Sequence, residues 1–131
     1  MLSYFRYGNA MKYVSFILVG LLLFSCKNND DDTEPINCTT EFVYGLTVQV
    51  RDANTGGIIV SDITVTARDE PYEEELVFLF DTFIGAGERA GNYTLTVQAD
   101  GYLTLITPVI EVGANECHVI GQFVELELQP L

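Results

Sequence analysis

The sequence has few of the residues on which enzymes and nucleic-acid-binding proteins depend. It has no Trp, one His (His118) and three Cys among 131 residues. Six Lys and Arg stand against 19 Asp and Glu, a formal net charge of −13. Such a chain repels a polyanion, which excludes a nucleic-acid binder that relies on phosphate contacts. Three Cys and one His leave little material for a zinc site or a Cys–His nucleophile pair, and we expect no cofactor and no enzymatic activity.

The sequence also lacks an apolar run long enough to cross a membrane. The longest run near the start, residues 14–24, has 11 residues, whereas a bilayer core needs about 20. Arg6 and Lys12 precede it. Basic residues followed by a short apolar run are typical of a signal peptide. Either Met1 or Met11 is the initiator, since Met11 directly precedes Lys12.

The apolar run ends in Leu23-Phe24-Ser25-Cys26, which resembles a bacterial lipobox. The resemblance implies a signal peptide over residues 1–25, diacylglycerol on the Cys26 sulfur, and acylation of the new amine with a chain such as palmitate. A thiolate is the nucleophile that this chemistry needs. Several acyl chains give stable membrane anchoring where one does not. An ordinary secretory signal followed by an unrelated Cys is the alternative interpretation.

Residues 26–37 are polar and acidic, and are predicted to form a solvated tether. In lipoproteins of Gram-negative bacteria, Asp directly after the lipidated Cys often signals retention in the inner membrane. Lys27 occupies that place here, which indicates the outer membrane. The run Asp30-Asp31-Asp32 resembles surface-export signals, and a plain charged linker facing the periplasm is the alternative. After cleavage the chain would carry a formal charge of −15, so lipid rather than charge would hold it to the membrane.

Residues 38–131 are predicted to form one all-β domain. Apolar and polar side chains alternate in four segments, which indicates strands with one buried face; the segments are 46–51, 63–68, 93–99 and 124–129. Turn residues separate them, and no segment keeps an apolar stripe at helical spacing. We therefore expect an antiparallel sandwich of about seven strands.

Two further segments are assigned from composition. Leu76–Phe80 is apolar throughout, which predicts a central strand covered on both faces. Residues 85–92 hold three Gly and are predicted to form a flexible loop at one end of the sandwich.

The two remaining cysteines, Cys38 and Cys117, are expected to form a disulfide, because paired thiols are the rule in exported proteins. We expect Cys38 just before the first strand and Cys117 at the start of the last. Closing the loop of 79 residues would stabilise the domain by about 4–5 kcal/mol in the chain-entropy treatment. Two free thiols in a redox or metal role are the alternative, although the CxxC spacing is absent.

Several segments together resemble the carboxypeptidase regulatory-like family of prealbumin-like (transthyretin-like) modules. The most specific is Gly91–Tyr102, which follows the family pattern G-x-Y-x-L-x-V-x-A-x-G-Y. The other matching segments are 48–57, 62–67, 116–119 and 124–130. The resemblance covers about residues 43–130 and implies a prealbumin-like β-sandwich. It implies no catalysis, because the zinc enzyme of carboxypeptidases is a separate domain.

Two candidate sites carry titratable groups. His118 adjoins Cys117 and has no second His, which favours a structural role over a general base or metal ligand. Asp69, Glu70, Glu73 and Glu74 are weak candidates for Ca²⁺, an ion that takes 6–8 oxygen ligands. They lack the spacing of a Ca²⁺ loop, so a solvated acidic turn is the alternative.

We interpret the chain as a lipid-anchored envelope protein that acts as an accessory module and contacts another envelope protein through a sheet edge or end loops. The alternative is a module that binds a surface glycan or peptide, with or without Ca²⁺. Exposed aromatic side chains on the end loops would favour the glycan; Tyr72, Phe83 and Tyr102 are the candidates, although core or corner roles are expected for Phe83 and Tyr102. A bare apolar edge strand would favour a protein partner. A hydrolase is not expected, because no nucleophile, base and orienting group can be assembled from the sequence.

Overall fold

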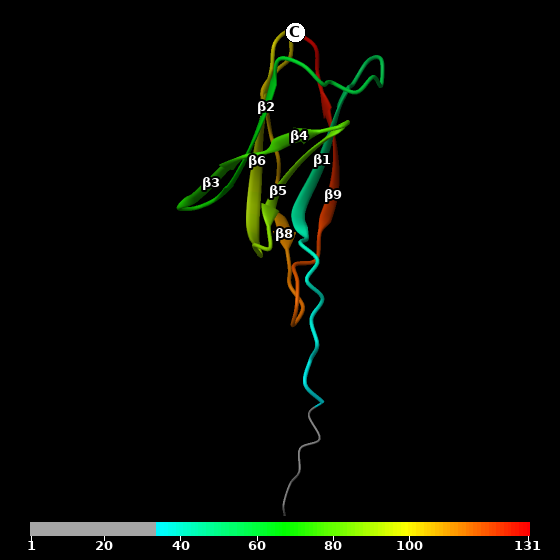
Figure 1. Cartoon of the computed structure of the whole chain (residues 1–131). Coiled ribbons are helices and arrows are strands. Elements are labelled where there is room, and N and C mark those ends of the chain that lie inside the picture. Colours follow the sequence, from blue (N-terminus) through cyan, green and yellow to red (C-terminus); the bar gives the residue numbers. More distant parts are fainter. Residues whose placement is uncertain (1–33) are drawn as a thin grey trace, which may run out of the picture. The chain divides into compact units, whose positions relative to one another are not determined.

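Nine β-strands and no helix form the part of the chain that the computed structural model describes, residues 34–131 (Figure 1). The strands are β1 (Tyr44–Asp52), β2 (Ile63–Asp69), β3 (Tyr72–Glu75), β4 (Val77–Leu79), β5 (Thr82–Gly87), β6 (Gly91–Ala99), β7 (Leu105–Ile106), β8 (Ile110–Val112) and β9 (Gln122–Leu128). Within these residues no helix could span a membrane. The predicted signal peptide, Cys26 and residues 27–33 of the tether lie outside the described residues.

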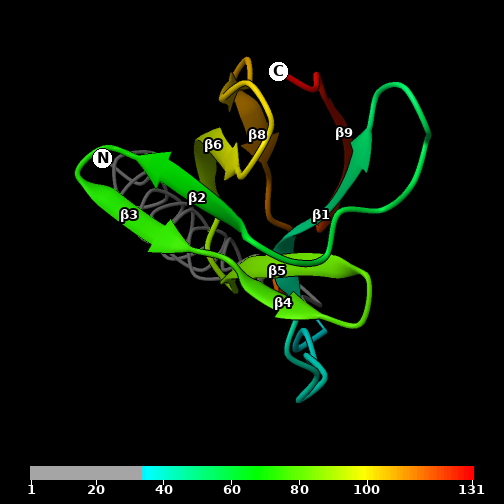
Figure 2. The same cartoon turned by 90° about the horizontal axis from the view of Figure 1, so that it is seen from above.

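The strands form two sheets, which confirms the predicted β-sandwich. One sheet has the order β4-β5-β1-β9, and the other has the order β3-β2-β6-β7, with β8 also pairing with β6. Viewed from above, the β2–β3 and β4–β5 hairpins belong to different layers (Figure 2). The expected count of about seven is exceeded because residues 72–79 and 105–112 each form two short strands. One pair departs from the antiparallel pattern: β1 and β9 run parallel, from Leu46 opposite Gln122 to Asp52 opposite Leu128.

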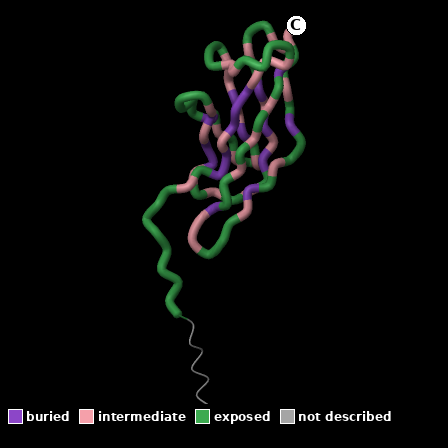
Figure 3. Tube along the Cα trace, turned by 90° about the vertical axis from the view of Figure 1, so that its right-hand side faces the viewer, coloured by how far each residue is buried: buried purple, intermediate pink, exposed green. Residues whose placement is uncertain are grey.

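The core lies between the sheets and is built by the alternating strands. In β6, Tyr93, Leu95 and Val97 are fully buried, while the residues between them are partly exposed. The same alternation buries Val65 and Ala67 in β2. In β1, Leu46, Val48 and Val50 are buried as the pattern predicts, but Gln49, which was expected to face water, is buried as well. Figure 3 shows the buried stretches in the middle of the strands and the exposed ones in the loops and near the described N-terminal end.

The prediction of a central strand at Leu76–Phe80 is wrong. β4 lies at the end of its sheet and pairs only with β5. The chain changes sheets just before it: Leu76 is buried, and its N–H donates to the carbonyl oxygen of Val65 in β2 at 2.8 Å. Leu76 is the single residue between β3, which belongs to one sheet, and β4, which belongs to the other. The chain thus enters the second sheet at its edge, and β4 is the edge strand.

The predicted glycine-rich loop is also wrong for residues 85–87, which are the second half of β5. A Cβ at Gly85 would collide with Leu76, and one at Gly87 would collide with the ring of Phe42. These glycines therefore allow close packing rather than a turn. The actual turn is short and lies between β5 and β6, where Glu88 has φ 48°.

Cys38 and Cys117 form the expected disulfide; they are 79 positions apart in sequence, and their Cα atoms are 5.3 Å apart. Cys38 precedes β1 as expected, but Cys117 lies in the loop between β8 and β9 rather than at the start of the last strand. In that loop the Asn115 side-chain oxygen accepts the N–H groups of Cys117 and His118 at 2.9 Å. The compact unit that contains the disulfide spans Ile36–Leu131.

Candidate functional site

The β4–β5 hairpin exposes four apolar side chains in a row. Val77, Phe78, Leu79 and Phe80 have 63%, 40%, 44% and 88% of their surface exposed. We call these four residues the hairpin patch. Fully burying an exposed side chain of this kind is worth about 1.5–3 kcal/mol; because these four side chains are partly exposed, covering the hairpin patch would gain a part of that free energy for each of them.

The tip of the hairpin has an unfavourable backbone conformation. β4 and β5 are joined by a two-residue turn, since Leu79 pairs directly with Thr82. The first turn residue, Phe80, has φ 60°, a left-handed conformation that costs about 1–2 kcal/mol for a residue with a Cβ. Glycine would relieve this cost at such a turn. Strain of this kind in an exposed aromatic residue is typical of binding sites.

The free edge of β4 offers main-chain hydrogen-bonding groups. Residues that flank a two-residue turn exchange both of their hydrogen bonds, so Leu79 is bonded to Thr82. The next pair, Phe78 and Phe83, is then of the non-hydrogen-bonded kind. The N–H and C=O groups of Phe78 consequently point away from β5, toward the free edge, while its ring packs on Phe83 at a centroid distance of 5.2 Å.

Carboxylates lie on both sides of the hairpin patch. Glu75 comes two positions before Val77, and Asp81 comes two positions after Leu79; both are exposed. Asp81 accepts a hydrogen bond from Gln49 Nε2 at 3.1 Å. Gln49 in turn accepts from Arg51 at 2.7 Å, and Arg51 pairs with Glu125 at 3.4 Å. This chain of contacts links Asp81 to β1 and β9 across the outer face of the sheet.

The four weak Ca²⁺ candidates are not gathered into one site. Asp69 binds Arg89 at 2.9 Å, and Glu73 binds Arg68 at 2.8 Å. Within residues 34–131 no group of three or more His, Cys, Asp or Glu could hold a metal ion.

The other two candidates lie apart from those ion pairs. Glu74 accepts the Tyr72 hydroxyl at 2.7 Å and the Ala86 N–H at 2.8 Å. The carboxylate of Glu74 raises the pKa of Tyr72 to about 12, because it stabilises the protonated phenol. Glu70 is exposed at the turn between β2 and β3. Three of the four carboxylates are therefore engaged within the fold, by Arg89, by Arg68 and by the Tyr72 and Ala86 contacts, and Glu70 is left exposed.

His118 belongs to a chain of polar groups that the sequence analysis did not anticipate. Its Nε2 lies 3.0 Å from Thr39 Oγ1, and its Nδ1 lies 2.8 Å from Glu88 Oε1. The three groups lie in the order hydroxyl, imidazole and carboxylate, the order found in catalytic triads, and the sequence analysis did not bring them together. Since Thr39 and His118 are 79 positions apart, spacing could not have revealed it.

The surroundings of this chain indicate a structural clamp. The N–H groups of Cys117 and His118 are both bound to Asn115, so neither is available to stabilise an oxyanion. Glu88 accepts the N–H of Val43 at 2.8 Å, which, together with bonds from His118 and Val119, lowers the pKa of Glu88. The clamp joins the segment before β1 to the β5–β6 turn.

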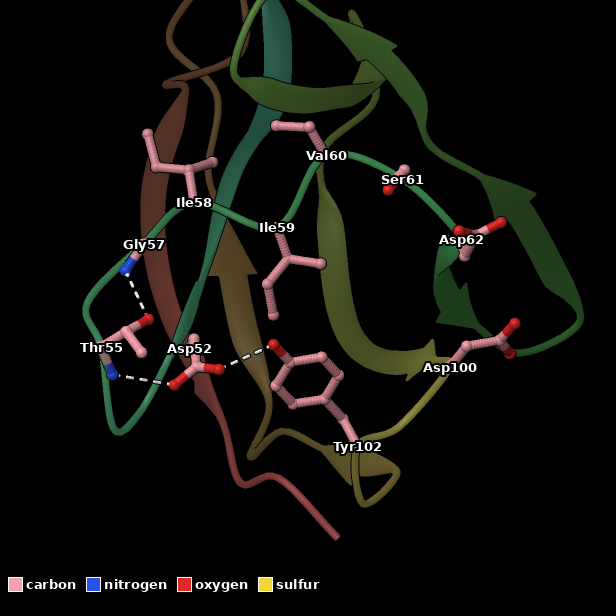
Figure 4. Close-up of a pocket in the computed structure, with 10 residues that line it drawn as sticks. All are labelled: Asp52, Thr55, Gly57, Ile58, Ile59, Val60, Ser61, Asp62, Asp100 and Tyr102. Carbon is pink, nitrogen blue, oxygen red and sulfur yellow. Dashed lines mark hydrogen bonds between the residues drawn. The ribbon is translucent and has the colours of Figure 1, made fainter.

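A surface pocket of about 330 Å³ lies at the opposite end of β1, among the loops around Asp52, Asp62 and Asp100 (Figure 4). Tyr102 donates its hydroxyl to Asp52 Oδ2 at 2.7 Å, and the N–H groups of Asn54 and Thr55 donate to Oδ1. These bonds lower the pKa of Asp52, the Tyr102 hydroxyl contributing most. Tyr102 thus has the predicted corner role.

The other two aromatic candidates are also engaged within the fold. Phe83 is 4% exposed and belongs to the core, as expected. The Arg89 guanidinium lies over the Tyr72 ring at 3.8 Å from its centroid. Neither ring therefore offers a solvent-exposed aromatic face on an end loop.

A scan of the sequence against models of protein families finds no match, and a search of curated proteins finds no significant match. The function must therefore be argued from the residues and their arrangement.

Proposed function

We propose that the chain is a non-catalytic, lipid-anchored envelope protein that serves as an accessory, protein-interaction module and binds its partner through the hairpin patch. The observation that carries this proposal is the run Val77–Phe80, four apolar residues that are 40–88% exposed on an edge strand. Contiguous apolar surface on a soluble domain marks an interaction site far more often than scattered single residues do.

The composition of the patch suits a protein contact. Aromatic residues near the centre of an interface carry much of its binding energy, and here Phe78 and Phe80 lie within one hairpin. Phe78 also presents its N–H and C=O groups at the free edge, where a partner strand can bond to them. β4 has only three residues and can form few main-chain hydrogen bonds with a partner strand. Side-chain contacts must therefore supply most of the affinity for the partner.

The aromatic side chains at the other sites give less support to a glycan-binding module. Phe83 is buried, Tyr102 is bonded to Asp52, and Tyr72 lies beneath Arg89. A sugar ring stacks on an aromatic face that is open to solvent, and the aromatic side chain with the largest exposed fraction in the described residues is Phe80.

The envelope location rests on the sequence, with the lipobox-like Leu23–Cys26 and the acidic tether as support. The family resemblance rests on Gly91–Tyr102; its strand part forms the central strand β6, and Tyr102 packs at the corner after the turn. The Cys26→Ser variant should be released from membranes into the soluble fraction. Retention of this variant in the membrane fraction would contradict the lipid anchor, while the Cys38→Ser variant serves as a control that keeps the lipidation site.

Site-specific photocrosslinking in the native cells tests the partner contact. A photoreactive phenylalanine analogue replaces Phe80 in one full-length protein and Phe123 in the other. Phe123 is a matched control because it is 61% exposed and lies on β9, the opposite edge of the same sheet. We expect one discrete adduct with an envelope protein from position 80 and none of that mass from position 123. Absence of an adduct at position 80, or the same adduct from both positions, would refute the proposal.

A further inference from the structure

The free edge of β4 lacks the features that usually keep edge strands apart. Its three residues, Val77–Leu79, include no charged side chain and no proline, which are common protections of an exposed edge. The nearest carboxylates in sequence are directed elsewhere: Glu75 pairs with Thr66 in the other sheet, and Asp81 accepts from Gln49 Nε2 at 3.1 Å. Residues 34–131 hold 16 Asp and Glu, so this edge is an uncharged stretch of a strongly acidic domain.

The main-chain groups that this edge offers are few. The N–H and C=O groups of Phe78 point toward the free edge, whereas the Leu76 N–H already donates to the carbonyl oxygen of Val65 at 2.8 Å. On the other side, β4 ends at the turn after Leu79. A long partner strand would therefore find no continuous ladder of hydrogen bonds here, and the edge suits a strand as short as β4 itself.

β4 is complementary to a second copy of itself about a two-fold axis. When two copies pair antiparallel with the axis at Phe78, the two Phe78 residues exchange both of their main-chain hydrogen bonds. Val77 of each copy then lies opposite Leu79 of the other, on the outer face of the sheet. Apolar side chains thus meet at both positions, and each copy uses the same surface, as an isologous contact requires.

The size of the hairpin patch suits a weak dimer. The exposed fractions of its four side chains together equal more than two whole side chains, which at the size of a buried aromatic residue is about 400 Å² on each copy. A standard stable interface buries about 800 Å² on each partner, so two copies would associate reversibly. Copies that share a membrane through lipid anchors meet at a high effective concentration, at which a weak contact is sufficient.

We propose that the hairpin patch pairs with the hairpin patch of a second copy of this chain, β4 against β4, antiparallel about Phe78. This inference rests on the proposed function, because it names the partner of the same surface. The pairing joins the β4-β5-β1-β9 sheets of two copies into one continuous sheet. The negative charge of each domain opposes the approach of the other, so the contact strengthens when salt screens that charge.

Cysteine pairs test the register in native membranes. Two differently tagged full-length copies are co-expressed, one with Val77→Cys and one with Leu79→Cys, and the isolated membranes are treated with a mild oxidant. The paired Cα atoms would lie about 4.5 Å apart, within the range of a disulfide. We expect about fivefold more mixed disulfide than when both copies carry Leu79→Cys, because those two positions are diagonal neighbours about 7–8 Å apart. Copies that both carry Phe123→Cys, on the opposite edge strand, control for random collision.

Salt dependence distinguishes pairing of two acidic copies from a contact between opposite charges. The yield of the mixed disulfide should rise about twofold or more between about 10 mM and about 0.5 M NaCl, because the screening length falls from about 30 Å to about 4 Å. A yield that falls as the salt concentration rises would overturn the inference, since attraction between opposite charges would then hold the contact.

Photocrosslinking at position 80 separates this inference from the proposed function. With two tagged copies in the same cells, we expect an adduct that has the mass of two chains and carries both tags. A discrete adduct with a different envelope protein, and none with both tags, would reject the second copy and leave the interaction module intact. Absence of any adduct at position 80 would refute both. A mixed disulfide no more abundant than in the Leu79→Cys control would overturn the antiparallel register and, with it, this inference.

Discussion

Strand β6 and the segment Leu76–Phe80 are both rich in apolar residues, yet their environments are opposite. In β6 the apolar residues alternate with Thr and Gln, and Tyr93, Leu95 and Val97 are fully buried. In Leu76–Phe80 every residue is apolar, and only Leu76 is buried. In these two segments, therefore, burial follows the alternation of apolar and polar residues and not the number of apolar residues.

The difference follows from the number of strands that flank each segment in its sheet. β6 has β2 on one side and β7 and β8 on the other, so the sandwich covers its inner face and bonds both of its edges. β4 has one neighbour and follows a residue at which the chain changes sheets. A run of apolar residues that the fold does not cover is available for another protein.

The largest expected effect comes from the covalent link in the body of the sandwich. Changing both Cys38 and Cys117 to Ser should lower the free energy of unfolding by about 4–5 kcal/mol, because the unfolded chain regains the freedom of a 79-residue loop. Urea unfolding of the variant and of the parent measures the difference. The parent in reducing buffer is the control and should behave like the variant. A loss of unfolding free energy below about 1 kcal/mol would show that the stability of the domain depends little on the disulfide.

Truncation of a core residue in β6 should have the next largest effect. Leu95→Ala should lower the free energy of unfolding by about 3 kcal/mol, the usual cost of removing a fully buried leucine side chain. Leu103→Ala is the matched control because Leu103 is 55% exposed, and it should change stability by less than about 0.5 kcal/mol. Similar losses for the two variants would mean that burial does not distinguish these positions.

A smaller, pH-dependent effect is expected at the corner that holds Tyr102. Tyr102→Phe removes the main contact that lowers the pKa of Asp52, so this pKa should rise toward its ordinary value of 3.8. Because the folded-state pKa of Asp52 is lowered, its stabilising contribution is present above pH 3.8 and is lost as the pH falls through the folded-state pKa. The variant should thus lose stability above pH 3.8 and match the parent in stronger acid.

Carboxyl titration by NMR measures the change at Asp52. Glu88 is an internal control, since its lowered pKa depends on Val43, His118 and Val119 rather than on Tyr102. An unchanged pKa of Asp52 in Tyr102→Phe, or an equal shift at Glu88, would contradict the assigned cause.

The smallest effect on stability is expected in the hairpin patch. Leu79→Ser should change the free energy of unfolding by less than about 0.5 kcal/mol, because Leu79 is 44% exposed on a short edge strand. The same variant should lose most of the crosslinked adduct at position 80. A stable variant that keeps its full adduct would show that Leu79 takes no part in the contact, whereas a loss above about 2 kcal/mol would place it in the core.

The fold could be predicted from the sequence where periodicity carries the information. The four alternating segments lie in β1, β2, β6 and β9, and the buried face of β6 is the predicted one. The cysteine pair could be predicted too, because Cys38 and Cys117 are the two that remain once Cys26 is assigned to the lipobox-like motif. These conclusions depend on local pattern or on counting.

The predictions that failed depend on contacts between distant residues. The edge position of β4 follows from the contact of Leu76 with Val65, and the strand at 85–87 follows from the packing of Gly85 against Leu76. The Thr39–His118 contact spans 79 positions. Composition alone assigns a continuous apolar run to the interior and a glycine-rich segment to a loop, and both assignments failed here for this reason.

The disulfide also determines how the domain carries mechanical load. β1 and β9 are parallel neighbours, Cys38 precedes β1, and Cys117 precedes β9. A force on the chain ahead of Cys38 therefore divides between the starts of both strands and pulls them in the same direction. Without the disulfide, the same force would reach β1 alone.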